Sequence, residues 1–223
     1  MARRILSAAV LAGMALSFSV PVAAELGVGA DVVSRYVFRG ALADDNVAVQ
    51  PFLSATHEMG SGMLEIGAWG SYAVTSSAGD GSNENDLYVT YSTGPLAITF
   101  TDYYYATGTG AGSDFFSYSN DDQVHQLEIM GAYNQGALGI SGAAIISGDP
   151  DTPIYVEASY TCTMDDDTSA SLTAALGTEH FYTSDGDPAL INVGASVTSG
   201  DYTAAYILNP DVEQSWLVFS MSF

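Results

Sequence analysis

The sequence predicts an all-β protein, a transmembrane antiparallel β-barrel of about twelve strands preceded by a cleaved signal peptide. Three observations support this fold class. Apolar and polar residues alternate in many successive segments. The connections between these segments are alternately tight turns and longer loops, and an apolar stretch lies near the amino terminus. Alternation with a period of two is typical of strands that have one apolar face. Short turns at one end and longer loops at the other are typical of outer-membrane barrels.

The amino-terminal segment has the layout of a secretory signal peptide. Arg3 and Arg4 precede an apolar stretch from 5 to about 20, and small residues precede Glu25. The stretch is shorter than the ~20 residues that a membrane-spanning helix needs. We therefore expect residues 1–24 to be removed on export to the outer membrane of a Gram-negative cell, and residues 25–223 to form one barrel domain.

Period-two alternation recurs along the rest of the chain, and no segment has a helical period. The predicted strands are about 26–39, 47–58, 62–74, 86–92, 96–106, 124–133, 137–146, 154–163, 169–181, 190–198, 202–208 and 214–223. The even-numbered strands are followed by tight turns, and most odd-numbered strands by longer loops. This arrangement places both ends of the barrel chain on the periplasmic side.

The mature protein is strongly acidic. With Arg3 and Arg4 removed, Arg35 and Arg39 face 26 acidic residues, and the chain has no lysine, so the net charge is −24. Such a surface excludes nucleic acid as a partner because nothing neutralises phosphate groups. About half of the acids fall in the longer loops and predict a negative outer rim; they are Asp44, Asp45, Asp80, Glu84, Asp114, Asp121, Asp122, Asp149, Asp151, Asp185, Asp187, Asp211 and Glu213. The charge indicates either a saline habitat or attraction of cations.

Side-chain alternation predicts which residues line the barrel. In the first strand Ala30, Val32, Ser34, Tyr36 and Phe38 share one face, and Asp31, Arg35 and Arg39 share the other. An arginine in lipid at the middle of the bilayer costs ~2–4 kcal/mol, so the arginine face points into the lumen. The same argument predicts a pore lined by Asp31, Arg35, Arg39, Glu58, Glu65, Trp69, Glu128, Glu157 and Glu179. Asp31 and glutamates of adjacent strands are the expected partners of the two arginines.

Asp102 does not fit this alternation, because it shares a face with apolar Ile98 and Phe100. Either a bulge shifts the register there, or the strand has already reached the rim. At the other end of the chain, Leu217, Phe219, Met221 and Phe223 form an outward apolar row. This pattern predicts a last strand that the barrel-assembly machinery recognises.

Several motifs resemble the TorF porin family of Gram-negative outer-membrane proteins. They are Ser34-Arg-Tyr-Val-Phe-Arg-Gly40, Val49-Gln-Pro-Phe-Leu-Ser54, Glu84-Asn-Asp-Leu-Tyr-Val-Thr-Tyr91, Asp102-Tyr-Tyr-Tyr105, the strand around Leu127 and Glu128, and Val218-Phe-Ser-Met-Ser-Phe223. Together they extend over essentially the whole mature chain. The chain departs from the family at Tyr105-Ala-Thr-Gly108, where a proline is expected before the glycine. The resemblance implies a barrel with a pore and leaves its solute open.

The sequence does not indicate an enzyme. His57, His125 and His180 are scattered and lack the spacing of shared metal ligands. The segment Asp80–Asp86 alternates oxygen ligands as a calcium loop does, but it lacks the required glycine and glutamate. We therefore expect no catalytic residues, no cofactor and no dedicated metal site, and only weak binding of divalent cations at the acidic rim.

These observations together predict an outer-membrane porin-like channel for small solutes or ions, with a preference for cations. The first alternative is a structural or adhesive barrel without transport, plugged by Trp69, Phe52 and contacts between arginines and carboxylates. The second alternative is an outer-membrane hydrolase, with His125 or His180 on the outer face near a rim.

Overall fold

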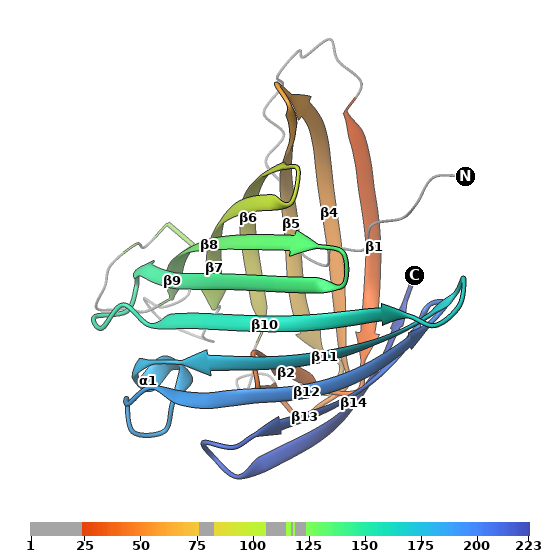
Figure 1. The fold of residues 1–223 in the computed structure, drawn as a ribbon. Coiled ribbons are helices and arrows are strands. Elements are labelled where there is room, and N and C mark those ends of the chain that lie inside the picture. The colour runs from red at the N-terminus through yellow and green to blue at the C-terminus, as the bar shows by residue number, and fades with distance from the viewer. Residues whose placement is uncertain (1–23, 76–82, 106–114, 117, 119–123) are drawn as a thin grey trace.

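A computed structural model describes residues 24–75, 83–105, 115–116, 118 and 124–223. The expected signal peptide, the loop segment around Asp80, and most of the loop that follows Tyr105 lie outside these residues. Within the described part, twelve strands close into an antiparallel barrel in the order β1-β14-β13-β12-β11-β10-β9-β8-β7-β6-β5-β4, and β2 and β3 form a separate two-stranded sheet (Figure 1). The predicted all-β barrel fold is therefore confirmed.

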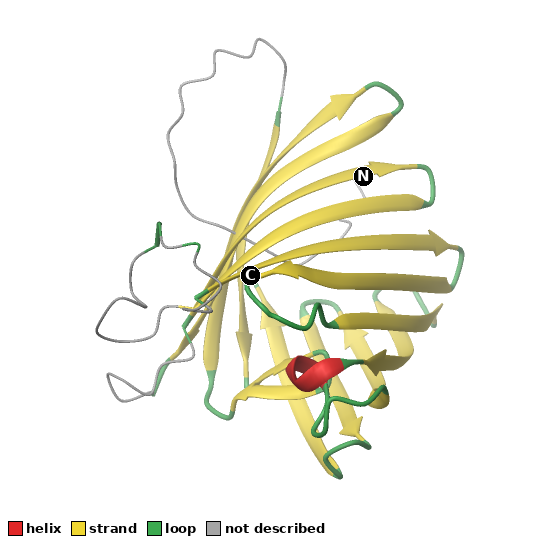
Figure 2. Ribbon diagram, turned by 90° about the vertical axis from the view of Figure 1, so that its left-hand side faces the viewer, coloured by secondary structure: helices red, strands yellow, loops and turns green. Residues whose placement is uncertain are grey.

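The strand boundaries follow the alternation of the sequence closely. The first part of the wall consists of β1 (Glu25–Val33), β4 (Ala48–Met59), β5 (Gly62–Ala73), β6 (Glu84–Thr93), β7 (Leu96–Tyr105) and β8 (His125–Gln135). The second part consists of β9 (Leu138–Ser147), β10 (Ile154–Thr163), β11 (Thr168–Gly177), β12 (Ala189–Ser199), β13 (Tyr202–Asn209) and β14 (Gln214–Ser222). The small sheet consists of β2 (Tyr36–Phe38) and β3 (Ala41–Asp44), and α1 spans Glu179–Tyr182. Figure 2 shows the strands curving round together, with α1 at one end.

Two predicted strands are too long. The first was expected to run to 39, but β1 ends at Val33 and the chain leaves the wall to form β2 and β3. Tyr36, expected on the outward face, is buried instead. The ninth was expected to run to 181, but β11 ends at Gly177 and α1 follows. In both cases alternation continues past the point where the wall pairing stops, and alternation alone does not show where a strand ends.

The wall has an apolar outer face and an interior with many polar groups. Large apolar side chains such as Leu26, Val28, Ile66, Leu172 and Phe219 are exposed on the outside. Inward positions of the wall strands carry buried polar groups, which are Gln50, Ser71, Glu84, Asp86, Gln126, Glu128 and Asn192. A closed sheet leaves few unpaired edges, and inward and outward residues alternate along each strand.

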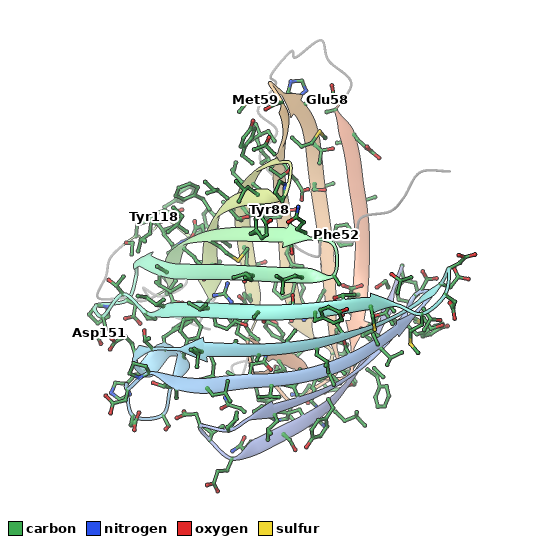
Figure 3. The ribbon with its side chains drawn as sticks, in the orientation of Figure 1. Phe52, Glu58, Met59, Tyr88, Tyr118 and Asp151 are labelled. Carbon is green, nitrogen blue, oxygen red and sulfur yellow. The ribbon has the colours of Figure 1, made fainter. Side chains whose placement is uncertain are left out.

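The two ends of the barrel differ in their connections, as the sequence predicts. Figure 3 places Glu58 and Met59 beside the tight β4–β5 turn at one end of the molecule, and Asp151 and Tyr118 toward the other end, where the longer connections lie. The sequence left open whether a bulge shifts the register at Asp102. The β6–β7 and β7–β8 pairings continue through this residue without a shift. It therefore lies near the rim, and no bulge occurs there.

Candidate functional site

The β2–β3 hairpin lies inside the barrel and forms the centre of the candidate site (Figure 1). The chain leaves the wall at Ser34, whose main-chain nitrogen donates to the Phe219 oxygen at 2.8 Å. The Ser34 hydroxyl accepts from the Phe219 nitrogen at 3.0 Å. The hairpin then turns at Arg39 and Gly40, which have φ of 50° and 86°. Two consecutive residues with positive φ between paired strands are typical of a tight type I′ turn.

Arg39, at the tip of this hairpin, makes several polar contacts in the lumen. Both of its terminal nitrogens donate to the Glu128 carboxylate, one of them at 2.8 Å. The guanidinium group also donates to the Tyr182 hydroxyl at 2.5 Å and lies 4.5 Å from the centre of the Tyr155 ring. Tyr103 donates to the same carboxylate at 3.0 Å. The side chains of Arg39 and Glu128 are only 12% and 1% exposed, so their charges are compensated within the protein.

The rest of the hairpin packs against other parts of the wall. The Tyr36 ring lies 5.4 Å from that of Trp69 on β5, and the Phe38 ring lies 5.8 Å from that of Tyr103 on β7. The Gly40 oxygen accepts from the Asn209 amide on β13 at 2.9 Å. With the Arg39 contacts to β8, β10 and α1, the hairpin touches strands on several sides of the barrel, and it narrows the lumen at this level.

A bulge in the wall provides the surface against which Gly40 packs. The β11–β12 pairing shifts between Ala175 and Leu176, and Ile191 has no Cα partner in it. Ile191 and Asn192 are consequently both buried, whereas strict alternation would turn one of them outward. A Cβ atom at Gly40 would collide with the Ile191 carbonyl oxygen. Glycine is thus required here both for its φ and for this close approach.

Two acidic residues lie on the lumen side beside the hairpin. Glu84 and Asp86 on β6 are 3% and 4% exposed, and Glu84 interacts with the side chains of Asp86, Tyr36 and Tyr105. Sequence reasoning placed Glu84 at the solvated outer rim, which is wrong because β6 starts at Glu84 and its first residues are already enclosed. The alternation of Glu84, Asp86 and Tyr88 was the signal that they share one face.

The remaining predicted lining residues are distributed along the lumen. Glu65 accepts from the Tyr88 hydroxyl, and Glu157 accepts from the Tyr155 hydroxyl at 2.5 Å. Asp31 lies on β1 opposite Gln50 of β4 and Ser222 of β14. Glu58 lies at the exposed β4–β5 end of the barrel. The structure therefore brings Arg39, Glu128 and Trp69 to the hairpin level and leaves the others elsewhere.

Two of the predicted lining residues are placed differently by the structure. Arg35 lies between β1 and β2 and pairs with Asp45 at 3.1 Å, with the two side chains 33% and 64% exposed. Glu179 begins α1 with a φ of 62°, beyond the end of β11. Both corrections follow from the overlong predicted strands. The expected partners of the arginines were also wrong, since Glu128 is on a distant strand and Asp31 binds neither.

The last strand has the predicted outward row. Leu217, Phe219 and Phe223 are 52%, 53% and 70% exposed. Met221 shares their face and pairs with Val32 of β1 and Tyr202 of β13. Phe223 donates its main-chain N–H to the Ala30 oxygen at 3.0 Å. This strand closes the wall against β1.

His125 forms a separate cluster on the outward side near the rim. Its Nδ1 lies 2.7 Å from an Asp102 oxygen, and its Nε2 lies 2.7 Å from the Phe115 main-chain oxygen. Tyr118 stacks on the ring at 4.2 Å and donates to Asp102 at 2.9 Å. Burial, with the Asp102 carboxylate, raises the pKa of Tyr118 to about 12. Because Nε2 faces a carbonyl oxygen and not a hydroxyl nucleophile, this arrangement differs from that of a serine hydrolase.

In the described ranges, no three histidine, cysteine, aspartate or glutamate side chains are grouped so as to hold a metal ion. The same part of the chain has no helix that is long and apolar enough to cross a membrane. Comparison with protein families gives a match over residues 19–217 to the family described as "Bacterial protein of unknown function (Gcw_chp)". The chain belongs to this family. A comparison with curated proteins finds no match. The resemblance to the TorF porin family stays a prediction.

Proposed function

We propose that the protein is an outer-membrane barrel, exported through its signal peptide and inserted by the barrel-assembly machinery. The closed twelve-stranded wall supports this location, because its outer face carries large apolar side chains while charged groups such as Glu128 are enclosed. This is the arrangement that lipid on the outside requires. Outer-membrane lipid is then the partner of the apolar face.

We further propose that the lumen serves as a narrow, cation-preferring passage for small solutes or ions. The observation that carries this proposal is the position of the β2–β3 hairpin inside a barrel with an acidic interior. A hairpin at this level excludes large solutes. The carboxylates around it favour cations, because charged rings and constrictions set the selectivity of channels.

A plugged barrel without transport is the second candidate, and the Arg39 contacts favour it. The guanidinium group bonds Glu128 and Tyr182 and lies against Tyr155, so the hairpin tip is fixed on three sides. A part held in this way either narrows the lumen or closes it completely. Only a measurement of conduction separates these two functions.

Single-channel recording of purified protein in planar bilayers tests the proposal. Three proteins are compared: the wild type, Arg39→Ala, and a variant in which residues 36–44 are replaced by a short Gly-Ser linker. Small conductance steps in the wild type that grow in the linker variant support the narrow passage. A silent wild type with a conducting linker variant identifies the hairpin as a plug and contradicts transport. Silence in all three, with folding verified by heat-modifiable migration, contradicts both functions.

A further inference from the structure

Glu84 and Asp86 form a buried acidic pair that no described basic side chain pairs with. Arg39 is bonded to Glu128, and Arg35 to Asp45. His125, the third basic partner in the described ion pairs, is bonded to Asp102. The mature chain has no lysine and no further arginine. Burial of carboxylates without a compensating charge is costly, so this pair requires either protons or an external cation.

The pair also presents oxygen atoms that lack partners. Glu84 Oε1, Asp86 Oδ1 and Gln126 Oε1 are buried, and none has a hydrogen-bond partner. All three residues are less than 10% exposed. Buried polar atoms normally find a partner, and three orphaned acceptors in one region indicate a missing donor or cation.

The register of the wall brings these residues to one part of the lumen. Asp86 lies opposite Tyr103, and Tyr103 lies opposite Gln126, so the three occupy one inward row across β6, β7 and β8. Glu84 is two residues from Asp86 on the same face and lies opposite Tyr105. Strands in a sheet are about 4.8 Å apart, so Asp86 and Gln126 face the lumen two strands from each other, with Tyr103 between them.

We propose that Glu84, Asp86 and Gln126 form a lumenal binding site for one hard divalent cation of the Ca²⁺ class. Two carboxylates supply the charge that balances a divalent ion. Carboxylate and amide oxygens are the ligands that Ca²⁺ and Mg²⁺ prefer, with water filling the remaining positions. The site rests on the lumen geometry alone and holds whether or not the barrel conducts.

Trp69, which lies beside the hairpin, allows binding at this site to be followed by fluorescence. Trp69 lies directly opposite Asp86 in the β5–β6 pairing and packs against Tyr36 of the hairpin. Tyr36 in turn interacts with Glu84. Loading of the site changes the charge beside the Trp69 ring, and its fluorescence reports binding.

The experiment uses the folded full barrel in detergent micelles, stripped of metal with a chelator. Equilibrium dialysis with radiolabelled Ca²⁺ measures stoichiometry, and Trp69 emission is followed in parallel. We expect a saturable emission change that is lost in Trp69→Phe. Asp86→Asn and Glu84→Gln should each weaken this binding at least tenfold and remove one bound ion. Glu58→Gln, at the exposed end of the barrel, is the matched control and should leave both readouts unchanged.

Three results would overturn the site. No saturable binding in the wild type would mean that the pair is neutralised by protons. Binding that persists in both Asp86→Asn and Glu84→Gln would place the ion at the acidic rim. An emission response that is the same for Na⁺ as for Ca²⁺ at equal ionic strength would indicate charge screening. Heat-modifiable migration verifies folding, and Gln126→Leu replaces any variant that fails this check, with the same expected loss.

Discussion

Arg39 and Arg35 carry the same charge in very different surroundings. The Arg39–Glu128 pair is almost completely enclosed, whereas Arg35 and Asp45 are both accessible to water. Arg39→Ala leaves Glu128 buried without compensation and should lower the free energy of unfolding by about 3–5 kcal/mol. Arg35→Ala should cost about 0–1 kcal/mol. Urea titrations of both variants in detergent micelles give the two values, and equal losses would contradict the burial argument.

Tyr182 gives the hairpin contacts a dependence on pH. Burial raises the pKa of its hydroxyl from the ordinary value of 10.0 to about 12, against the opposing effect of Arg39. The folded state therefore favours the neutral phenol. This stabilisation is fully present below pH 10 and is lost as the pH rises through the folded pKa near 12.

Tyr182→Phe should remove this loss, which amounts to about 2–3 kcal/mol across the window from pH 10 to 12. Unfolding free energies measured at intervals through this window provide the comparison with the wild type. Tyr118→Phe is the control. The pKa of Tyr118 is also raised to about 12, but its side chain is 54% exposed, and solvent screening should keep its effect small. Identical slopes for wild type and Tyr182→Phe would exclude the proposed contribution.

Individual residues show what alternation predicts and what it misses. Glu128 and Trp69 were placed inside because the cost of polar groups in lipid settles the face of a wall strand. The partner of Glu128 was missed, because a turn at Arg39 with positive φ takes this side chain out of the wall. A glycine after an arginine is a weak signal for such a turn. Contacts between segments far apart in sequence carry no periodic signature at all.

The hairpin is the element on which the proposed function depends, and Gly40 is its tightest point. Gly40→Ala combines a positive φ with a collision against Ile191, so it should disrupt docking of the hairpin. Gly60→Ala is matched, since Gly60 has φ of 63° and no atoms within 4 Å of an added Cβ. The control should cost roughly 1–2 kcal/mol from backbone strain alone. A larger loss for Gly40→Ala in the same urea titration is expected, and equal losses would contradict close packing.

The last strand is the element that closes the wall. Phe223→Asp places a charge in the outward row of Phe219 and Met221 and should lower the amount of folded barrel in the outer-membrane fraction several-fold, because this row is the expected assembly signal. Ser220→Asp, on the other face of β14, is the control and should reduce it less. Outer-membrane fractionation with heat-modifiable migration measures both. Normal levels of folded Phe223→Asp would contradict the proposed role of the row.

Elements in the wall were predicted better than elements outside it. The strand predicted at 154–163 has the same limits as β10, and most others differ by one or two residues. Wall strands have an apolar outer face and a more polar lumen face, so their period is visible. The hairpin and α1 are enclosed within the barrel or at its end. Their burial depends on which strands happen to surround them, and the local sequence does not encode this.

At the scale of the whole molecule, charge should decide which ions pass. The lumen encloses Glu84, Asp86 and Glu128 against the single buried guanidinium of Arg39 in the described chain. If the wild type conducts, the reversal potential in a salt gradient should indicate cation preference at low ionic strength. At 1 M salt the Debye length falls to ~3 Å, and the preference should weaken. Anion selectivity at low salt would contradict this view of the lumen.

The wall is joined unevenly, and this has a mechanical consequence. β1 pairs with β4 at nine positions but with β14 at only three. The hairpin follows β1 directly. Through Gly40 it contacts β12 and β13, which lie on the other side of the joint between β1 and β14. The hairpin that obstructs the lumen therefore also links the two sides of the β1–β14 joint, which has the fewest paired residues in the described wall. Removing the hairpin from the lumen would break these contacts and lower the stability of the barrel. Any passage of solutes is therefore expected to occur with the hairpin in place.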